Sequence, residues 1–225
     1  MSQWQGVDTV LLDMDGTLLD LQFDNFFWQR HIPEVYAKKN KLTFEDAERK
    51  VGVWYKEKEG TLDWYCIDYW SDRLGINVSE EKMAAQHRID FRPGAQEFLA
   101  ALSNDPSKRV ILLTNAHPRT LSIKVERLSL AHYFDALVSS HEFGFPKEND
   151  AFWPAAQTQL GFESSKAVFI DDSLAVLSSA KRFGIAYVWG VAKPDTQAQT
   201  VFKGDAELPV VESFDYLTQL SLRNF

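Results

Sequence analysis

Short apolar runs along the chain alternate with longer segments in which apolar and polar residues recur at helical spacing. The runs are rich in Val, Ile, Leu and Phe and lie near residues 10–12, 109–113, 136–139, 167–170 and 185–189. Apolar strands alternating with helices are typical of a parallel sheet covered on both faces. The pattern therefore predicts an α/β fold with a doubly wound parallel sheet, extended by a short edge strand at 209–211 and a last helix over 214–222.

Residues 19–89 differ from the rest of the chain because they contain several helical patterns and no convincing strand. Helices are expected over about 24–36, with Asp24 as the cap, from the capping sequence at Thr43, over 62–74 and from Ser79. Many aromatic residues crowd this segment, and most are expected to pack in a small helical core, leaving the remainder to stack on a flat ligand. The prediction is a core domain, residues 1–18 and 90–225, with a helical insertion, residues 19–89.

Polar side chains follow four of the predicted strands. They are Asp13 and Asp15, Thr114 and Asn115, Lys147, and Asp171 and Asp172. Each alone has an ordinary explanation as a turn residue, an exposed lysine or an acid at a helix N-terminus. In a doubly wound sheet, however, ligands bind at the carboxyl ends of the strands, and the fold would gather all these groups at one edge.

Counting charges at that edge indicates a cation. Two carboxylates about 4 Å apart repel by roughly 4 kcal/mol at an effective dielectric constant of about 20. Four aspartates face a single lysine, and a phosphate monoester would add nearly two negative charges. Oxygen ligands and phosphate suit Mg²⁺. The sequence contains no cluster of Cys and His residues that would favour zinc.

Composition and net charge limit the classes of partner that the protein is expected to bind. The chain has 225 residues, a net charge of −8 and 45% hydrophobic residues, which is typical of a globular protein with a substantial core. The negative charge disfavours nucleic acids and anionic membranes as partners. Cys66 is the only cysteine, so no intramolecular disulfide can form. With no targeting segment and no run long enough to span a bilayer, the predicted location is the cytoplasm.

The motifs, taken in order, resemble those of the haloacid dehalogenase superfamily, most of whose members are Mg-dependent phosphotransferases. The resemblance rests on Asp13-Met14-Asp15-Gly16-Thr17, Thr114-Asn115, Lys147 and Asp171-Asp172. It implies a Rossmann-like core, and it implies that residues 19–89 form a type 1 cap domain that closes over the site and selects the leaving group. Two departures are Glu148, where many relatives have Pro after the lysine, and an Asp-Asp pair in place of Gly-Asp.

The resemblance also implies a role for each residue. Asp13 is the implied nucleophile, which forms an aspartyl-phosphate, and Asp15 is the implied general acid and then base. The ligands implied for Mg²⁺ are Asp13, the main-chain carbonyl of Asp15, Asp172 and, through water, Asp171. The groups implied to bind the phosphoryl oxygens are Thr114, Lys147 and the main-chain N–H of Asn115.

Further stretches resemble the bacterial GMP/IMP 5′-nucleotidases of this superfamily. They include Trp64-Tyr65-Cys66 and Thr114-Asn115-Ala116-His117-Pro118. A purine nucleoside monophosphate is then the implied substrate, and we hypothesise that Phe23, Asn25 or Trp28 reaches its base or ribose. We expect His117 to cap the next helix. Alternatives are a phosphatase for sugar phosphates or other small metabolites, a phosphomutase, and a non-catalytic binding protein.

Overall fold

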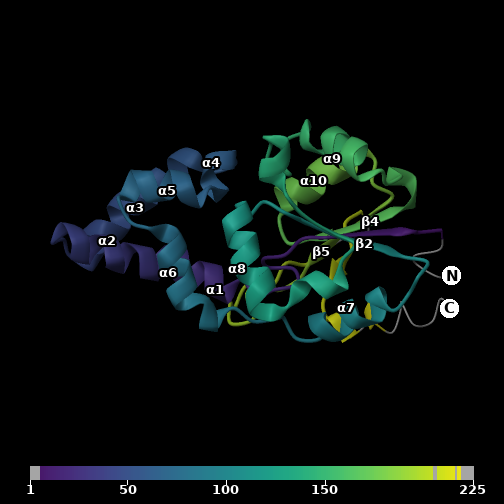
Figure 1. Cartoon of the computed structure of the whole chain (residues 1–225), viewed down its shortest axis with the longest axis horizontal. Coiled ribbons are helices and arrows are strands. Elements are labelled where there is room, and N and C mark those ends of the chain that lie inside the picture. The colour runs from purple at the N-terminus through teal and green to yellow at the C-terminus, as the bar shows by residue number, and fades with distance from the viewer. Residues whose placement is uncertain (1–5, 205–206, 216, 219–225) are drawn as a thin grey trace.

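The computed structural model describes residues 6–204, 207–215 and 217–218, and its centre is a parallel sheet of six strands (Figure 1). The strands are β1 (Thr9–Leu12), β2 (Arg109–Thr114), β3 (Ala136–Ser139), β4 (Ala167–Asp171), β5 (Tyr187–Val191) and β6 (Val210–Val211). Their order across the sheet is β3-β2-β1-β4-β5-β6. The predicted α/β fold is confirmed, and β5 begins two residues later than its apolar run suggested.

Helices cover both faces of the sheet. The helices beside it are α7 (Ala95–Ser103), α8 (Pro118–Leu128), α9 (Phe152–Leu160) and α10 (Leu174–Phe183), with short turns η3 (Leu130–Tyr133), η4 (Ser140–Phe143) and η5 (Ser164–Lys166). Val10 and Leu12 pack in the apolar cluster that contains Phe98 of α7, whereas Leu11 packs with Trp153 of α9. Successive strand residues therefore face opposite layers, as the two-residue period of a strand requires.

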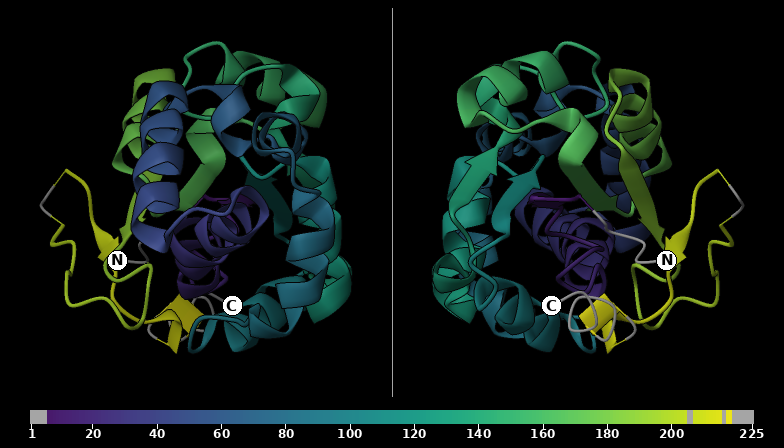
Figure 2. Two further views of the ribbon diagram at one scale, coloured as in Figure 1. Left: turned by 90° about the vertical axis from the view of Figure 1, so that its left-hand side faces the viewer. Right: turned by 90° about the vertical axis from the view of Figure 1, so that its right-hand side faces the viewer.

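The helical segment, residues 22–88, lies beside the sheet and covers neither of its faces (Figure 1). It comprises α1 (Gln22–Phe26), the π-turn η1 (Phe27–His31), α2 (Ile32–Asn40), α3 (Phe44–Lys58), α4 (Leu62–Tyr65), α5 (Ile67–Leu74), α6 (Val78–Ala85) and η2 (Gln86–Arg88). Seen from that side, its purple and blue helices lie in front of the sheet (Figure 2).

The chain enters and leaves the helical segment through two adjacent stretches. The Arg92 N–H donates to the Leu18 carbonyl at 2.9 Å, and the Asp20 N–H donates to the Asp90 carbonyl at 3.1 Å. The predicted domain boundaries, after residues 18 and 89, fall at this crossing, and the division into two domains stays a prediction. Among the described residues, no helix has both the length and the apolar character needed to cross a membrane.

Helix ends differ from the prediction at two informative places. Asp24 does not cap a helix, because the helix begins at Gln22 and continues through η1 to Asn40, and the Asp24 carboxylate binds two lysines instead. The helix predicted over 62–74 is interrupted at Cys66, whose backbone is extended (φ −88°, ψ 107°).

Other predicted ends can be compared directly. Thr43 caps α3 as predicted, by accepting the Asp46 N–H at 3.1 Å. Asp150, which lies just before α9, does not cap that helix and pairs with Arg182 at 2.6 Å. Of the predicted last helix, residues 214, 215, 217 and 218 are helical, and the others lie outside the described residues.

Candidate active site

Three aspartates meet where β1 and β4 end. Leu12 pairs with Ile170 in the sheet, so the residues that follow, Asp13 and Asp171, lie side by side. Carboxylate oxygens of Asp13, Asp171 and Asp172 all lie within 4.8 Å of one another. The register of two neighbouring parallel strands thus produces the acidic cluster that the sequence predicted at this edge.

Lys147 joins two of these carboxylates. Its ammonium donates to Asp13 Oδ1, to Asp171 Oδ2 at 2.7 Å and to the Leu113 carbonyl at 2.9 Å. The side chain is 1% exposed, and the Lys147 N–H donates to Asn115 Oδ1 at 2.8 Å, which holds the loop after β3 against the end of β2. Burial would lower the pKa of Lys147, but Asp13 and Asp171 outweigh it and raise that pKa, so the lysine is charged.

The single ammonium of Lys147 does not neutralise the three carboxylates of Asp13, Asp171 and Asp172. Burial raises the pKa of Asp13 to about 7, with Lys147 opposing the rise and Asp171 adding to it. The pKa of Asp172 is raised well above its usual value by burial and by the neighbouring Asp171 and Asp13. Three carboxylates facing one ammonium favour a further cation, and the hard oxygen donors fit Mg²⁺.

Gly16 makes room for this cluster. It has a φ of +80°, and a Cβ at this position would come within 2.3 Å of Asp172 Oδ2. The turn after β1 therefore requires glycine both for its left-handed backbone and for the close approach of Asp172.

A second buried network holds Asp15. Asp15 Oδ1 accepts from Lys124 of α8 at 2.5 Å, and the same ammonium donates to Asp24 of α1 at 2.5 Å. Asp24 in turn accepts from Lys82 of α6 at 2.7 Å. Lys124 and Lys82 are each 1% exposed, so a desolvated chain of charges runs from the end of β1 into the helical segment.

Sequence reasoning missed these two lysines. Lys124 lies between the apolar positions Leu121 and Leu128 of α8, and Lys82 lies between Val78 and Ala85 of α6. A lysine three or four residues from apolar neighbours on both sides falls on the buried stripe of its helix. A lysine at such a position could have been predicted to be buried and therefore paired with a carboxylate, but the sequence does not indicate which carboxylate.

The two carboxylates of this second network have their pKa values shifted in opposite directions. Burial raises the pKa of Asp15 to about 6, against Lys124 and together with Asp24. Burial also acts to raise the pKa of Asp24, but Lys124 and Lys82 overcome it and hold that pKa below its usual value. Of the two carboxylates, Asp15 is therefore the one that takes up a proton more readily.

The other predicted residues border the same region. Thr114 is buried, and its hydroxyl accepts the Ala116 N–H at 3.0 Å. Asn115 donates to Glu148 Oε2 at 2.8 Å, and Glu148 Oε1 accepts from the Tyr65 hydroxyl at 2.9 Å. Glu148, the departure from the usual proline, thus connects the strand ends to the helical segment.

A cavity of about 410 Å³ lies over these groups. Its lining includes all seven predicted site residues: Asp13, Asp15, Thr114, Asn115, Lys147, Asp171 and Asp172. The helical segment adds an aromatic wall, consisting of Trp28, Tyr55, Trp64, Tyr65 and Trp70. The volume falls in the range of pockets that enclose small molecules.

The aromatic wall is built by edge-to-face packing. Tyr55 meets Trp70 at 4.9 Å between ring centroids, with the rings at 89°. The Tyr55 hydroxyl is buried and has no hydrogen-bond partner among the described residues. Of the three residues hypothesised to reach the substrate, Asn25 and Trp28 line the cavity, and their contact with a substrate stays a prediction. Phe23 is not among the lining residues and packs, 3% exposed, against the Lys82 ammonium.

A family model for haloacid dehalogenase-like (HAD) hydrolases matches residues 7–184, which include every residue of the two charge networks. The chain belongs to this family. The match runs continuously through the helical segment as well as the sheet, so this HAD-like hydrolase carries both parts of the candidate site within the family region.

Two curated relatives and two solved structures illustrate the likeness. GMP/IMP nucleotidase YrfG of Escherichia coli K12 is 46% identical over 193 residues, 86% of each chain. The phosphorylated carbohydrates phosphatase of Thermotoga maritima is 29% identical and covers 82% of this chain and 85% of its own. A HAD phosphatase from Thermococcus onnurineus has a TM-score of 0.78 at 16% identity, covering 95% of this HAD-like hydrolase and 97% of its own chain. L-2-haloacid dehalogenase from Xanthobacter autotrophicus has a TM-score of 0.64 at 19% identity, covering 97% and 99%. At these low sequence identities, the similarity to the two solved structures supports the fold alone.

Proposed function

We propose that this HAD-like hydrolase is a Mg-dependent phosphomonoesterase that works through an aspartyl-phosphate and acts on purine nucleoside monophosphates. The observation that carries the proposal is the cavity itself. Asp13, Asp15 and Lys147 line the part of it that we call the floor, and the helical segment contributes the aromatic wall. A phosphate would be bound at the floor and a flat base at the wall.

In the first step, a carboxylate oxygen of Asp13 attacks phosphorus and the bond from phosphorus to the ester oxygen breaks. Asp15 gives its proton to that departing oxygen, which leaves as the nucleoside hydroxyl. In the second step, water attacks phosphorus, Asp15 takes its proton, and inorganic phosphate leaves while the Asp13 carboxylate is restored. Lys147, Thr114 and the Asn115 N–H bind phosphoryl oxygens and stabilise the developing charge.

The acidic cluster would hold the cation. Asp13, Asp172 and the main-chain carbonyl of Asp15 are the proposed ligands, with Asp171 acting through water. When bound, Mg²⁺ supplies positive charge to the phosphoryl oxygens and keeps Asp13 ionised. Lys147 binds Asp13 and Asp171, which leaves the third carboxylate, Asp172, without an ammonium partner and available to a cation.

The aromatic wall supports a purine as the leaving group's base. Base–aromatic stacking is worth about 1–3 kcal/mol for each base, and the wall offers several indole and phenol rings. The unpartnered Tyr55 hydroxyl would gain a hydrogen bond from a polar atom of the base. The name of the 46% identical relative, a GMP/IMP nucleotidase, is in line with this assignment.

A sugar phosphate is the second candidate, because the 29% identical relative is named a phosphorylated carbohydrates phosphatase. A hexose offers hydroxyl groups and no flat ring, so it would leave the aromatic wall largely uncovered. The two candidates share the chemistry at the floor and differ only at the wall.

The deciding experiment measures phosphate release from GMP, IMP, CMP and a hexose phosphate, with Mg²⁺ and with a chelator. We expect the purine nucleotides to give the highest kcat/KM and the chelator to abolish release. Asp13→Asn should lose more than about 10⁴-fold in kcat while keeping its melting temperature. Full activity of that variant would remove Asp13 as nucleophile, and a preference for hexose phosphate would remove the purine assignment.

Tyr55→Phe tests the wall separately. It should raise KM for IMP by about tenfold, the equivalent of about 1.4 kcal/mol for one hydrogen bond, and leave kcat nearly unchanged. Tyr133→Phe is the matched control, since the Tyr133 hydroxyl accepts from Gln96 of α7 and lies outside the cavity lining. An unchanged KM in Tyr55→Phe would show that its hydroxyl does not meet the substrate.

A further inference from the structure

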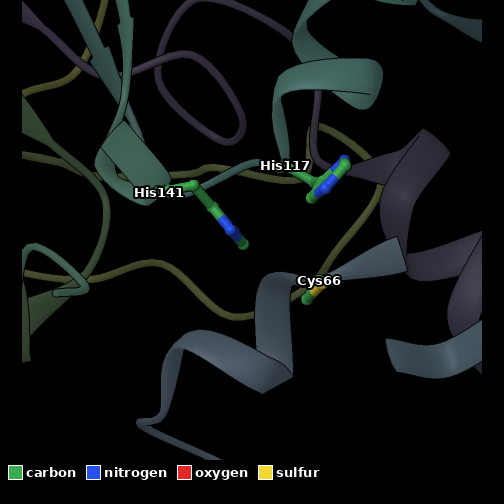
Figure 3. A group of neighbouring side chains, drawn as sticks. All are labelled: Cys66, His117 and His141. Carbon is green, nitrogen blue, oxygen red and sulfur yellow. The ribbon is translucent and has the colours of Figure 1, made fainter. Parts of the chain in front are cut away.

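Three side chains that commonly bind metals lie close together (Figure 3). Cys66 lies at the break between α4 and α5 in the helical segment, His117 precedes α8, and His141 lies in η4 after β3. Ligand atoms of the three lie within 4.8 Å of one another. None of the three is among the residues that line the cavity. The expectation that no cluster of Cys and His residues is present was wrong, because these residues lie far apart along the chain and only the fold brings them together.

His141 is prepared to act as a ligand. Its Nε2 is buried and has no hydrogen-bond partner among the described residues. Burial lowers the pKa of His141 to about 4, with His117 adding to the effect, while a hydrogen bond to the Asn115 main chain opposes it. In the tautomer that carries its proton on Nδ1, the unpartnered Nε2 of a neutral imidazole offers its lone pair to a metal ion.

His117 and Cys66 each already hold one hydrogen bond. His117 Nδ1 accepts the Arg119 N–H at 3.2 Å, and its Nε2 lies 3.5 Å from Asp68 Oδ2. Cys66 Sγ accepts the Tyr69 N–H at 3.5 Å, and this N–H would point equally at a coordinated thiolate. Coordination through either nitrogen of His117 weakens its bond to Arg119, which favours a site that releases its metal over a permanent structural one.

The donor set and its spacing suit a tetrahedral ion. Bonds of about 2.0 Å to nitrogen and 2.3 Å to sulfur place neighbouring ligand atoms roughly 3.5 Å apart. The ligand atoms of the three residues all lie within 4.8 Å of one another, so small side-chain movements would bring them to this spacing. Because Cys66 belongs to the helical segment and both histidines belong to the sheet part, an ion held by all three would join the two parts.

We propose that Cys66, His117 and His141 form a binding site for a borderline or soft transition-metal ion such as Zn²⁺ or Co²⁺, which ties the helical segment to the sheet. One nitrogen from each histidine and the sulfur occupy three positions, and water or Asp68 takes the fourth. Binding releases the thiol proton of Cys66 to solvent. The nearby carboxylate cluster offers only hard oxygen donors, so the two sites select different ions.

An ion that joins the two parts would also affect the rate of turnover. An ion bound to Cys66 and to both histidines at once favours the arrangement in which the two parts lie together. Product must leave a cavity whose wall comes from the helical segment, and opening steps of this kind often limit kcat. The ion is therefore expected to lower kcat, an effect that depends on the proposed phosphatase activity, whereas the binding itself does not.

The first test is a titration of the purified full chain with Co²⁺ in the presence of excess Mg²⁺. A thiolate-to-cobalt charge-transfer band and the strong visible bands of tetrahedral cobalt should appear and saturate at one equivalent, and Zn²⁺ should remove them. Cys66→Ser should abolish the charge-transfer band, and His141→Ala should raise the dissociation constant by more than about tenfold. Serine is a good N-cap residue, so the Cys66 variant is expected to keep α5 and the melting temperature.

Two controls separate this site from others. His132→Ala removes a histidine outside the cluster and should bind Co²⁺ like the unaltered chain. Asp172→Asn alters the carboxylate cluster and should keep the charge-transfer band. Absence of the band in the unaltered chain, or its persistence in Cys66→Ser, would overturn the proposal.

The second test measures phosphate release with saturating Mg²⁺ and added Zn²⁺. Zn²⁺ should lower kcat several-fold in the unaltered chain, and Cys66→Ser should be resistant. If no substrate releases phosphate, the proposed function fails while the cobalt titration still decides the metal site. Equal inhibition of both chains would place the inhibitory ion elsewhere and overturn the role of the cluster in turnover.

Discussion

Lys147 and Lys124 are both buried, and each binds two aspartates, yet they connect different parts of the molecule. Lys147 joins Asp13 to Asp171, two residues that follow neighbouring strands of one sheet. Lys124, on α8, joins Asp15 at the end of β1 to Asp24 on α1. The first contact lies within the sheet part, and the second spans the junction with the helical segment.

The balance of charge differs as well. Around Lys147, one ammonium faces the carboxylates of Asp13, Asp171 and Asp172. Around Lys124, the two ammonium groups of Lys124 and Lys82 face two carboxylates. The unbalanced network favours a further cation, which the proposed Mg²⁺ site would supply, whereas the balanced one joins the two parts without any ion.

The largest expected effect comes from Lys147→Met. Removing the ammonium leaves three buried carboxylates together, and breaking a buried ion pair costs about 3–5 kcal/mol of stability. Phosphate release should fall by at least about 10³-fold, because the charge developing on the phosphoryl group loses a donor. Urea unfolding with and without Mg²⁺ measures the stability, and Mg²⁺ should stabilise this variant more than the unaltered chain. An equal Mg²⁺ effect in both would contradict the unbalanced charge count.

Next comes Lys124→Met. Asp24 keeps Lys82, so only Asp15 loses its cation, and the loss of stability should be smaller, about 1–3 kcal/mol. We expect kcat to fall by about 10²-fold with little change in KM, because a displaced Asp15 transfers protons poorly. Mg²⁺ should not restore stability here. A variant with full kcat would show that Asp15 needs no help from Lys124.

A smaller effect is expected for the coupling free energy between Lys124 and Asp24, which lie on opposite sides of the junction. Lys124→Met and Asp24→Asn should together destabilise the protein by about 1–2 kcal/mol less than the sum of the single changes. The cycle is measured by urea unfolding of the four proteins. Asp150→Asn, which breaks an exposed pair with Arg182, is the control partner and should be additive with Lys124→Met. Additivity of the Lys124 and Asp24 changes would mean that the junction is held by other contacts.

The smallest effect concerns His141, which faces the helical segment from the sheet side. Its pKa is lowered to about 4 in the folded protein, below the unfolded value near 6.5. The unfolded chain therefore binds this proton first on acidification, and the stability contributed by neutral His141 is present above pH 6.5 and lost as the pH falls toward 4. For a partly buried ring, the loss between pH 7 and pH 5 should be about 1 kcal/mol.

The measurement is urea unfolding at both pH values in a chelator, with His141→Gln as the comparison. The stability difference between the two proteins should shrink at pH 5. A difference that is independent of pH would mean that His141 titrates normally in the folded chain.

The amino-acid sequence determined the sheet and the position of most charged groups at its edge. Apolar runs located all six strands, with β5 displaced by two residues, because a strand buried on both faces needs continuous apolar residues. Asp13 and Asp171 could be placed together because consecutive residues after paired parallel strands end at the same edge. Lys147 could be assigned to the same edge because it lies in the loop after the third predicted strand.

Only the tertiary structure decided how the helical segment meets that edge. Which lysine binds Asp15, and whether Phe23 or Tyr55 lines the cavity, depends on the angle and rotation at which α1, α3, α6 and α8 pack. The break at Cys66, and its meeting with His117 and His141, follow from that packing as well. The physical reason is that strand register is specified by neighbouring residues along two paired strands, whereas helix docking is decided by the summed fit of many weak, non-local contacts.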